Sequence, residues 1–108
     1  MFARILATFA LSAVVSHTAL AQEPGYAGKG LAYATQVCAQ CHAVRAGDKF
    51  SPNLKAPSFG DIANTSGVTG ISLAASLHTV HENMPAFVLS MNERDNIIAY
   101  ILSLKGRN

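Results

Sequence analysis

The chain has 108 residues, of which 50% are hydrophobic and 13% charged, and its formal net charge is +2. This length fits one domain and is too short for two. Outside residues 1–21, seven lysines and arginines stand against six aspartates and glutamates. Such a small positive excess excludes strong electrostatic attraction to nucleic acid or to an acidic membrane surface.

Residues 1–21 have the pattern of a cleaved signal peptide. Arg4 precedes an apolar run at residues 5–15, and the small side chains at the end of the segment suit a signal peptidase that cuts after Ala21. The run falls well short of the roughly 20 residues that span a bilayer, which makes a retained membrane anchor the weaker alternative. We expect export to the periplasm and a mature domain at residues 22–108 without a membrane anchor.

Residues 38–42 read Cys-Ala-Gln-Cys-His and point most directly to a function. At this C-x-x-C-H spacing two thiols can add to the two vinyl groups of a haem. On a helix, Cys38 and Cys41 lie three residues apart on one face, and His42 is brought over the ring to bind iron. The segment therefore predicts one haem c, attached through Cys38 and Cys41 and ligated by His42.

Three other interpretations of the two cysteines compete: a dithiol–disulfide redox pair, half of a zinc site, or a structural disulfide. A redox pair of the thioredoxin type belongs in a βαβ context, which the chain lacks. A zinc site needs further ligands, which only scattered histidines could offer. A disulfide between residues so close in sequence restricts the unfolded chain very little. Export and a methionine downstream favour the haem.

The chain resembles a small class I cytochrome c of the exported bacterial type with a single haem. The similarity runs from about Gly28 to Leu104. It rests on the C-x-x-C-H segment, the proline-rich stretch 51–59, the Asn-Met-Pro segment 83–85 and the terminal helix with Tyr100. One position departs from the family, which often has an aromatic residue four places before the first cysteine, where this chain has Ala34 beside Tyr33.

Hydrophobic spacing predicts an all-α domain, and the resemblance implies the cytochrome c fold, with three main helices and loops around one covalently attached haem. The first helix is expected at residues 28–39 and runs into the haem motif. Residues 43–60 contain several prolines and glycines and are expected to form a loop. A short helical turn is expected at residues 58–64. No β pattern or repeat is present in the mature chain.

Two serines mark the expected starts of the later helices. Ser72 is predicted to cap a helix that ends near Val80 and turns Leu73, Leu77 and Val80 to one face. Ser90 and Glu93 have the spacing of a capping box. The helix after them is expected to pack Tyr100 against the first helix and to turn five apolar residues largely inward: Ile97, Ile98, Ile101, Leu102 and Leu104.

The resemblance implies a methionine sulfur as the second axial ligand, and the mature chain offers Met84 and Met91. Pro85 restricts Met84 to extended geometry, so its thioether is expected to project from a loop toward the iron. Met91 lies at the start of the last helix, where packing or exposure is the plainer interpretation. Met84 is the predicted ligand; His81 or His78 would instead give bis-histidine iron, and an open site is the remaining alternative.

A histidine bound to a metal usually donates its other ring N–H to a carbonyl. The resemblance implies that a proline in the loop after the motif supplies this carbonyl. Pro57 is the first candidate and Pro52 the second. The alternative is that both prolines only stiffen the loop.

Iron with two protein ligands has no open position for substrate, which argues against an enzyme and for one-electron exchange between Fe(III) and Fe(II). We expect a monomeric periplasmic electron carrier with redox proteins as partners. The donor would be a dehydrogenase or a quinol-oxidising complex, and the acceptor an oxidase or reductase. The alternatives are a dedicated haem c subunit of a periplasmic dehydrogenase complex and, with Met84 displaced, a haem that binds ligands or reduces peroxide.

Overall fold

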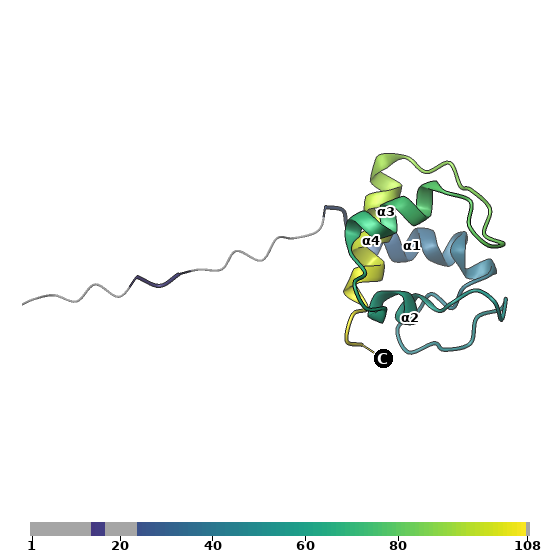
Figure 1. Cartoon of the computed structure of the whole chain (residues 1–108), viewed down its shortest axis with the longest axis horizontal. Coiled ribbons are helices and arrows are strands. Elements are labelled where there is room, and N and C mark those ends of the chain that lie inside the picture. Colours follow the sequence, from purple (N-terminus) through teal and green to yellow (C-terminus); the bar gives the residue numbers. More distant parts are fainter. Residues whose placement is uncertain (1–13, 17–23, 108) are drawn as a thin grey trace, which may run out of the picture.

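The computed structural model describes residues 14–16 and 24–107. Within these ranges the chain forms four α-helices and one short 3-10 helix, and no β-strand. In chain order they are α1 (Ala27–Gln36), η1 (Cys38–Gln40), α2 (Phe59–Asn64), α3 (Gly70–His78) and α4 (Met91–Ser103) (Figure 1). The predicted all-α fold is confirmed for this part of the chain, and α1, α3 and α4 are its longer helices.

The predicted signal peptide lies outside the described residues except for residues 14–16, and the cleavage site after Ala21 lies outside them entirely. The domain boundary at residue 22 therefore stays a prediction. In the part of the chain that the structure describes, no helix is long and apolar enough to cross a membrane.

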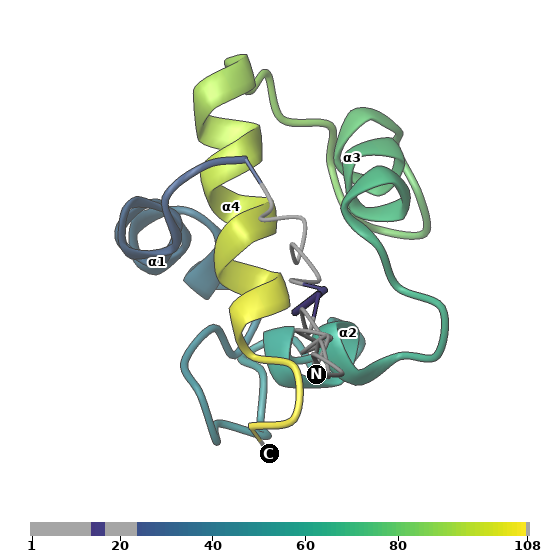
Figure 2. The same ribbon diagram turned by 90° about the vertical axis from the view of Figure 1, so that its left-hand side faces the viewer.

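Helix α4 lies between α1 and α3 (Figure 2), and its contact with α1 is the most extensive contact between helices in the described part of the chain. The crossing depends on Gly30, because a Cβ atom there would overlap the carbonyl group of Asn96 and the Cβ of Tyr100. Asn96 Oδ1 also accepts a hydrogen bond of 2.8 Å from the backbone N–H of Tyr26, just before α1. Ala34, which stands in the place of the family's aromatic residue, is fully buried in this core. The predicted packing of Tyr100 against the first helix is confirmed.

Helix α4 supplies much of the buried core. Its first turn carries the predicted capping box, in which the Ser90 N–H donates to Glu93 Oε2 at 2.8 Å and the Glu93 N–H donates to Ser90 Oγ at 3.2 Å. Of the five apolar residues predicted to turn inward, Leu102 is half-buried and the others are buried: Ile97, Ile98, Ile101 and Leu104.

Helix α3 begins and ends earlier than predicted. Thr69, and not Ser72, is the N-cap: Thr69 Oγ1 accepts from the Ser72 N–H at 3.1 Å, and Ser72 Oγ accepts from the Thr69 N–H at 2.9 Å. Both residues have side chains that can cap, but Thr69 has the extended backbone that an N-cap requires. The helix ends at His78, so the prediction that Val80 shares a helical face with Leu73 and Leu77 is wrong, and Val80 is 69% exposed.

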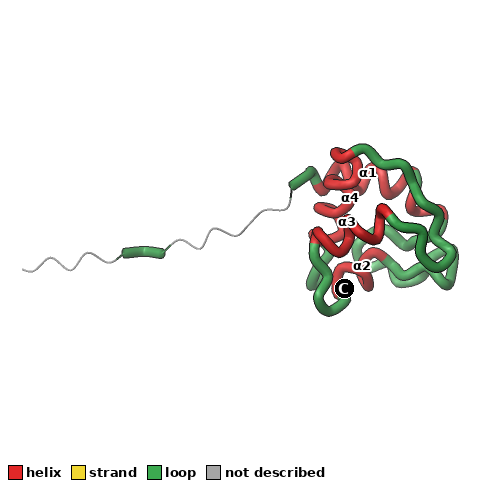
Figure 3. The backbone as a smooth tube through the Cα atoms, turned by 45° about the horizontal axis from the view of Figure 1, so that its top comes forward, coloured by secondary structure: helices red, strands yellow, loops and turns green. Residues whose placement is uncertain are grey.

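The predicted turn at residues 58–64 is α2. Ser58 Oγ caps it by accepting a hydrogen bond of 3.0 Å from the Asp61 N–H, and Phe59 and Ala63 turn into the core. The loop before α2 and the loop between α3 and α4 project at the same end of the domain (Figure 3). This arrangement brings the sequence motifs of the two loops to one site.

Candidate functional site

A cavity of about 470 Å³ lies between these two loops and the inner faces of the helices. Its volume is within the range of about 300–1,000 Å³ that is typical of ligand sites. All four predicted site residues line it: Cys38, Cys41, His42 and Met84. The helices contribute side chains that are apolar: Phe59, Ile62, Leu73, Leu77, Ile97 and Ile101. The fold therefore joins the cysteine motif and the methionine loop around one apolar space.

The cysteine motif is a tight turn and not the continuous helix that the sequence predicts. Helix α1 ends at Gln36, and the N–H groups of Cys41 and His42 both donate to the carbonyl oxygen of Cys38, at 3.1 and 2.9 Å. In a 3-10 turn, side chains three residues apart lie almost directly above one another. The expected pairing of Cys38 and Cys41 on one side of the segment is thus kept, with a tighter backbone.

The environment of the Cys38 thiol is not that of an attacking thiol in a redox pair. Both are free, Cys38 is half-buried and Cys41 is exposed. Burial raises the pKa of the Cys38 thiol, whereas an attacking thiol of a redox motif needs a lowered pKa. Within residues 14–16 and 24–107, no three histidine, cysteine, aspartate or glutamate side chains are grouped closely enough to hold a metal ion. The zinc alternative has no ligand set in this part of the chain.

The imidazole of His42 is oriented by the loop that follows it. Its Nδ1 lies 2.7 Å from the carbonyl oxygen of Pro57. Because a carbonyl can only accept, Nδ1 is the donor, and in the neutral imidazole Nε2 keeps its lone pair. This is the arrangement in which a histidine binds a metal through Nε2. The loop proline predicted first, Pro57, makes this contact, and Pro52 does not.

Two contacts that the sequence did not predict hold the same loop in place. Buried Ser51 accepts a hydrogen bond of 2.9 Å from the Ala43 N–H. The Tyr100 hydroxyl donates to the carbonyl oxygen of Val44, and burial raises the pKa of this phenol, which keeps it a donor. These contacts tie the segment after His42 to its own loop and to α4. No local pattern signals them, because each partner is distant in the sequence or isolated in an irregular loop.

Met84 lies on the loop between α3 and α4 and is half-buried against the cavity. Its N–H donates to the carbonyl oxygen of His81 at 3.0 Å, and the two residues form an isolated antiparallel bridge. Between them, Glu82 has a left-handed backbone with a φ of 49°. The predicted projection of Met84 from a loop is confirmed, and His81 lines the same cavity.

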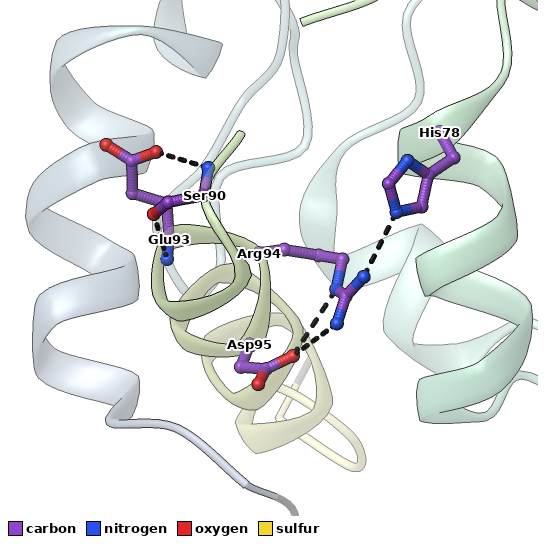
Figure 4. A network of polar contacts seen from close by, with 5 residues as sticks. All are labelled: His78, Ser90, Glu93, Arg94 and Asp95. Carbon is purple, nitrogen blue, oxygen red and sulfur yellow. Dashed lines mark hydrogen bonds and ion pairs between the residues drawn. The ribbon is translucent and has the colours of Figure 1, made fainter. Parts of the chain in front are cut away.

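The other two candidate ligands lie elsewhere. Met91 is the first residue of α4 and is 70% exposed. His78 ends α3, and its Nε2 accepts a hydrogen bond of 3.0 Å from Arg94, which also pairs with Asp95 at 3.3 Å (Figure 4). Neither Met91 nor His78 lines the cavity.

Comparison with known proteins agrees with this geometry. Residues 27–101 match the family described as "Cytochrome C oxidase, cbb3-type, subunit III". The chain belongs to this family of c-type cytochromes. The cytochrome is also 38% identical over 90 residues to "Cytochrome c-552" of Bradyrhizobium diazoefficiens, an alignment that covers 83% of each protein. No solved structure matches it.

Family membership fixes the class of cofactor and of activity. The protein is an electron carrier with a covalently attached haem c, and its partners are redox proteins. The residues around the cavity fit this group: two thiols in the wall, an imidazole with a free Nε2, a thioether on the facing loop, and apolar helix faces.

Proposed function

We propose that the protein is a periplasmic one-electron carrier whose haem is attached through Cys38 and Cys41 and ligated by His42 and Met84. One observation carries this proposal: all four side chains line a single apolar cavity although Met84 lies far from the motif in the sequence. When bound there, haem c supplies an iron that exchanges one electron between Fe(III) and Fe(II).

Each residue has a separate task. Cys38 and Cys41 anchor the ring on the side of the 3-10 turn. The Pro57 carbonyl fixes the tautomer of His42 and makes its Nε2 a stronger donor to iron. Met84 supplies a thioether, which raises the reduction potential relative to a second imidazole. Because His42 and Met84 would both hold the iron, no coordination position would be left for a substrate, and we infer that the protein is not an enzyme.

The location rests on the sequence. The apolar run at residues 5–15 and the small residues up to Ala21 support export and cleavage, which would leave a mature domain at residues 22–108 in the periplasm. A monomer that docks briefly with a donor and an acceptor suits a shuttle, since fast turnover needs small, transient interfaces. The donor would be a dehydrogenase or a quinol-oxidising complex, and the acceptor an oxidase or a reductase.

The family description favours a second candidate function. It names a subunit of an oxidase, which supports a dedicated electron-transfer subunit in a larger complex, either an oxidase or a dehydrogenase. Gel filtration of the native extract distinguishes the two. A shuttle elutes as a haem-containing monomer, and a subunit elutes with a stable partner in fixed ratio.

Two methionine variants test the ligand set, with holoprotein produced by a periplasmic haem-attachment system. Met84→Ala should keep covalent haem but lose the weak far-red sulfur-to-iron band. Its reduction potential should be lower than that of the wild type, because the ligands of haem iron set the potential over a range of roughly 0.8 V. Met91→Ala is the matched control, because this methionine is exposed and outside the cavity. It should keep the band and the potential. A Met84→Ala protein that matches the wild type in both would contradict the proposal.

A further inference from the structure

His81 has three features of an iron ligand although Met84 occupies that role in the proposed function. The first is position. His81 and Met84 face each other in an isolated antiparallel bridge, and residues directly opposite in such a bridge turn their side chains to the same side, with Cβ atoms about 4.5–5.5 Å apart. Both side chains line the cavity that also holds His42.

The second feature is the tautomer. His81 Nδ1 lies 3.0 Å from the carbonyl oxygen of Thr79, so Nδ1 is the donor, and in the neutral imidazole Nε2 keeps its lone pair. His42 has the same arrangement with Pro57. His78 differs from both, because its Nε2 already accepts a hydrogen bond from Arg94 (Figure 4). Among the described histidines, His42 and His81 line the cavity with a free Nε2.

The third feature is the freedom of the loop. Residues 79–88 are exposed apart from half-buried Met84, and Val80 and Val88 bury little surface. The backbone turns at Glu82, which has a φ of 49°, and the Met84 N–H donates to the carbonyl oxygen of His81 across this turn. None of residues 79–88 belongs to the buried core, so a local rearrangement of this turn would leave the core packed.

We propose that His81 is a reserve axial ligand, which binds the iron through Nε2 when the thioether of Met84 is lost. The inference rests on the proposed His42/Met84 ligation and adds a second state to it. The exchange breaks an iron–sulfur bond and forms an iron–nitrogen bond, with no net electron transfer. Its consequence would be slow binding of small molecules to the iron and a lower reduction potential.

The test compares holoproteins that lack Met84. In Met84→Ala, His81 should give low-spin oxidised iron without the far-red band, and the reduced protein should bind carbon monoxide slowly. In Met84→Ala/His81→Gln, the oxidised iron should become high-spin and carbon monoxide should bind at least tenfold faster. Met84→Ala/His78→Gln is the matched control and should behave like Met84→Ala. Equal covalent haem content and equal helix content in circular dichroism show that all three variants are folded.

Three outcomes would contradict the proposal, and they differ in what else they affect. High-spin iron in Met84→Ala, unchanged by His81→Gln, overturns the reserve role and leaves Met84 as the normal ligand. Loss of low-spin iron in the single variant His81→Gln makes His81 the primary ligand, and it overturns both the reserve role and the proposed ligation by Met84. A far-red band that persists in Met84→Ala contradicts the proposed function, and with it the reserve role that depends on it.

Discussion

The carbonyl oxygen of Pro57 lies 2.7 Å from Nδ1 of His42, and it links the loop before α2 to the motif that contains the haem cysteines. Phe59, two residues further on, places its ring 5.5 Å from that of His42, and its N–H donates to the carbonyl oxygen of Ala43 at 2.8 Å. The imidazole is thus held from two directions. Outer contacts of this kind fix the orientation and the tautomer of a histidine that binds a metal.

Cys38 and Cys41 are each expected to form one bond to the haem. Replacing both with serine keeps the approximate size of the side chains but removes the nucleophilic sulfur. The double variant should therefore contain no covalent haem after denaturation and acid–acetone extraction, and should fail to accumulate as stable holoprotein. Full covalent haem in the double variant would overturn the attachment through these residues.

The close crossing of α1 and α4 predicts that substitution of one glycine lowers the free energy of unfolding. Gly30→Ala puts a methyl group against the Asn96 carbonyl and Tyr100 Cβ, and overpacking of this kind costs about 1–3 kcal/mol in the free energy of unfolding. Gly28→Ala, on the same helix with nothing within 4 Å, should instead stabilise by up to about 1 kcal/mol. Urea unfolding of the two holoproteins measures both. Equal effects at the two sites would show that the helices do not cross here.

The buried hydroxyl of Tyr100 predicts that the free energy of unfolding falls at alkaline pH. Burial raises its pKa above the ordinary value of 10.0, so the unfolded chain releases this proton first. The stabilising contribution is therefore complete below about pH 10 and is lost as the pH rises through the folded-state pKa. Tyr100→Phe should lower the free energy of unfolding at pH 7 by about 1–3 kcal/mol, because the Val44 carbonyl loses its donor.

The same variant should also flatten the loss of stability above pH 10. Tyr33 is a second contributor, since burial also raises its pKa, so the alkaline loss is reduced and not abolished. Tyr26→Phe serves as the control, because this ring is 70% exposed and its hydroxyl lies outside the core. Urea unfolding at a series of pH values measures the free energy of unfolding of the wild type and of the Tyr100→Phe and Tyr26→Phe variants. An unchanged alkaline slope in Tyr100→Phe would contradict the buried hydrogen bond.

The elements that the sequence predicts well are those with local causes. The capping box of Ser90 and Glu93 needs only neighbours in the chain, and the inward face of α4 follows from its period. The spacing of Cys38 and Cys41 is likewise local, and it places both on one side of the segment whether the backbone is the predicted α-helix or the observed 3-10 turn.

The features that the sequence misses depend on choices between similar residues or on distant contacts. Thr69 and Ser72 both have capping side chains, and only the backbone decides that Thr69 is the cap. The contact between Tyr100 and Val44 joins residues that are far apart in the sequence, so it exists only in the folded chain. Pro57 could be ranked above Pro52 only through a resemblance to known cytochromes, since nothing in the local sequence says which carbonyl reaches His42.

The absorption spectrum of the oxidised and reduced wild-type holoprotein tests the central claim most directly. His42/Met84 ligation predicts a c-type spectrum after reduction and the weak far-red sulfur-to-iron band in the oxidised form. Covalent haem without that band would contradict Met84 as the ligand. A protein with no covalent haem, although produced with an active attachment system, would contradict the assignment of Cys38, Cys41 and His42 altogether.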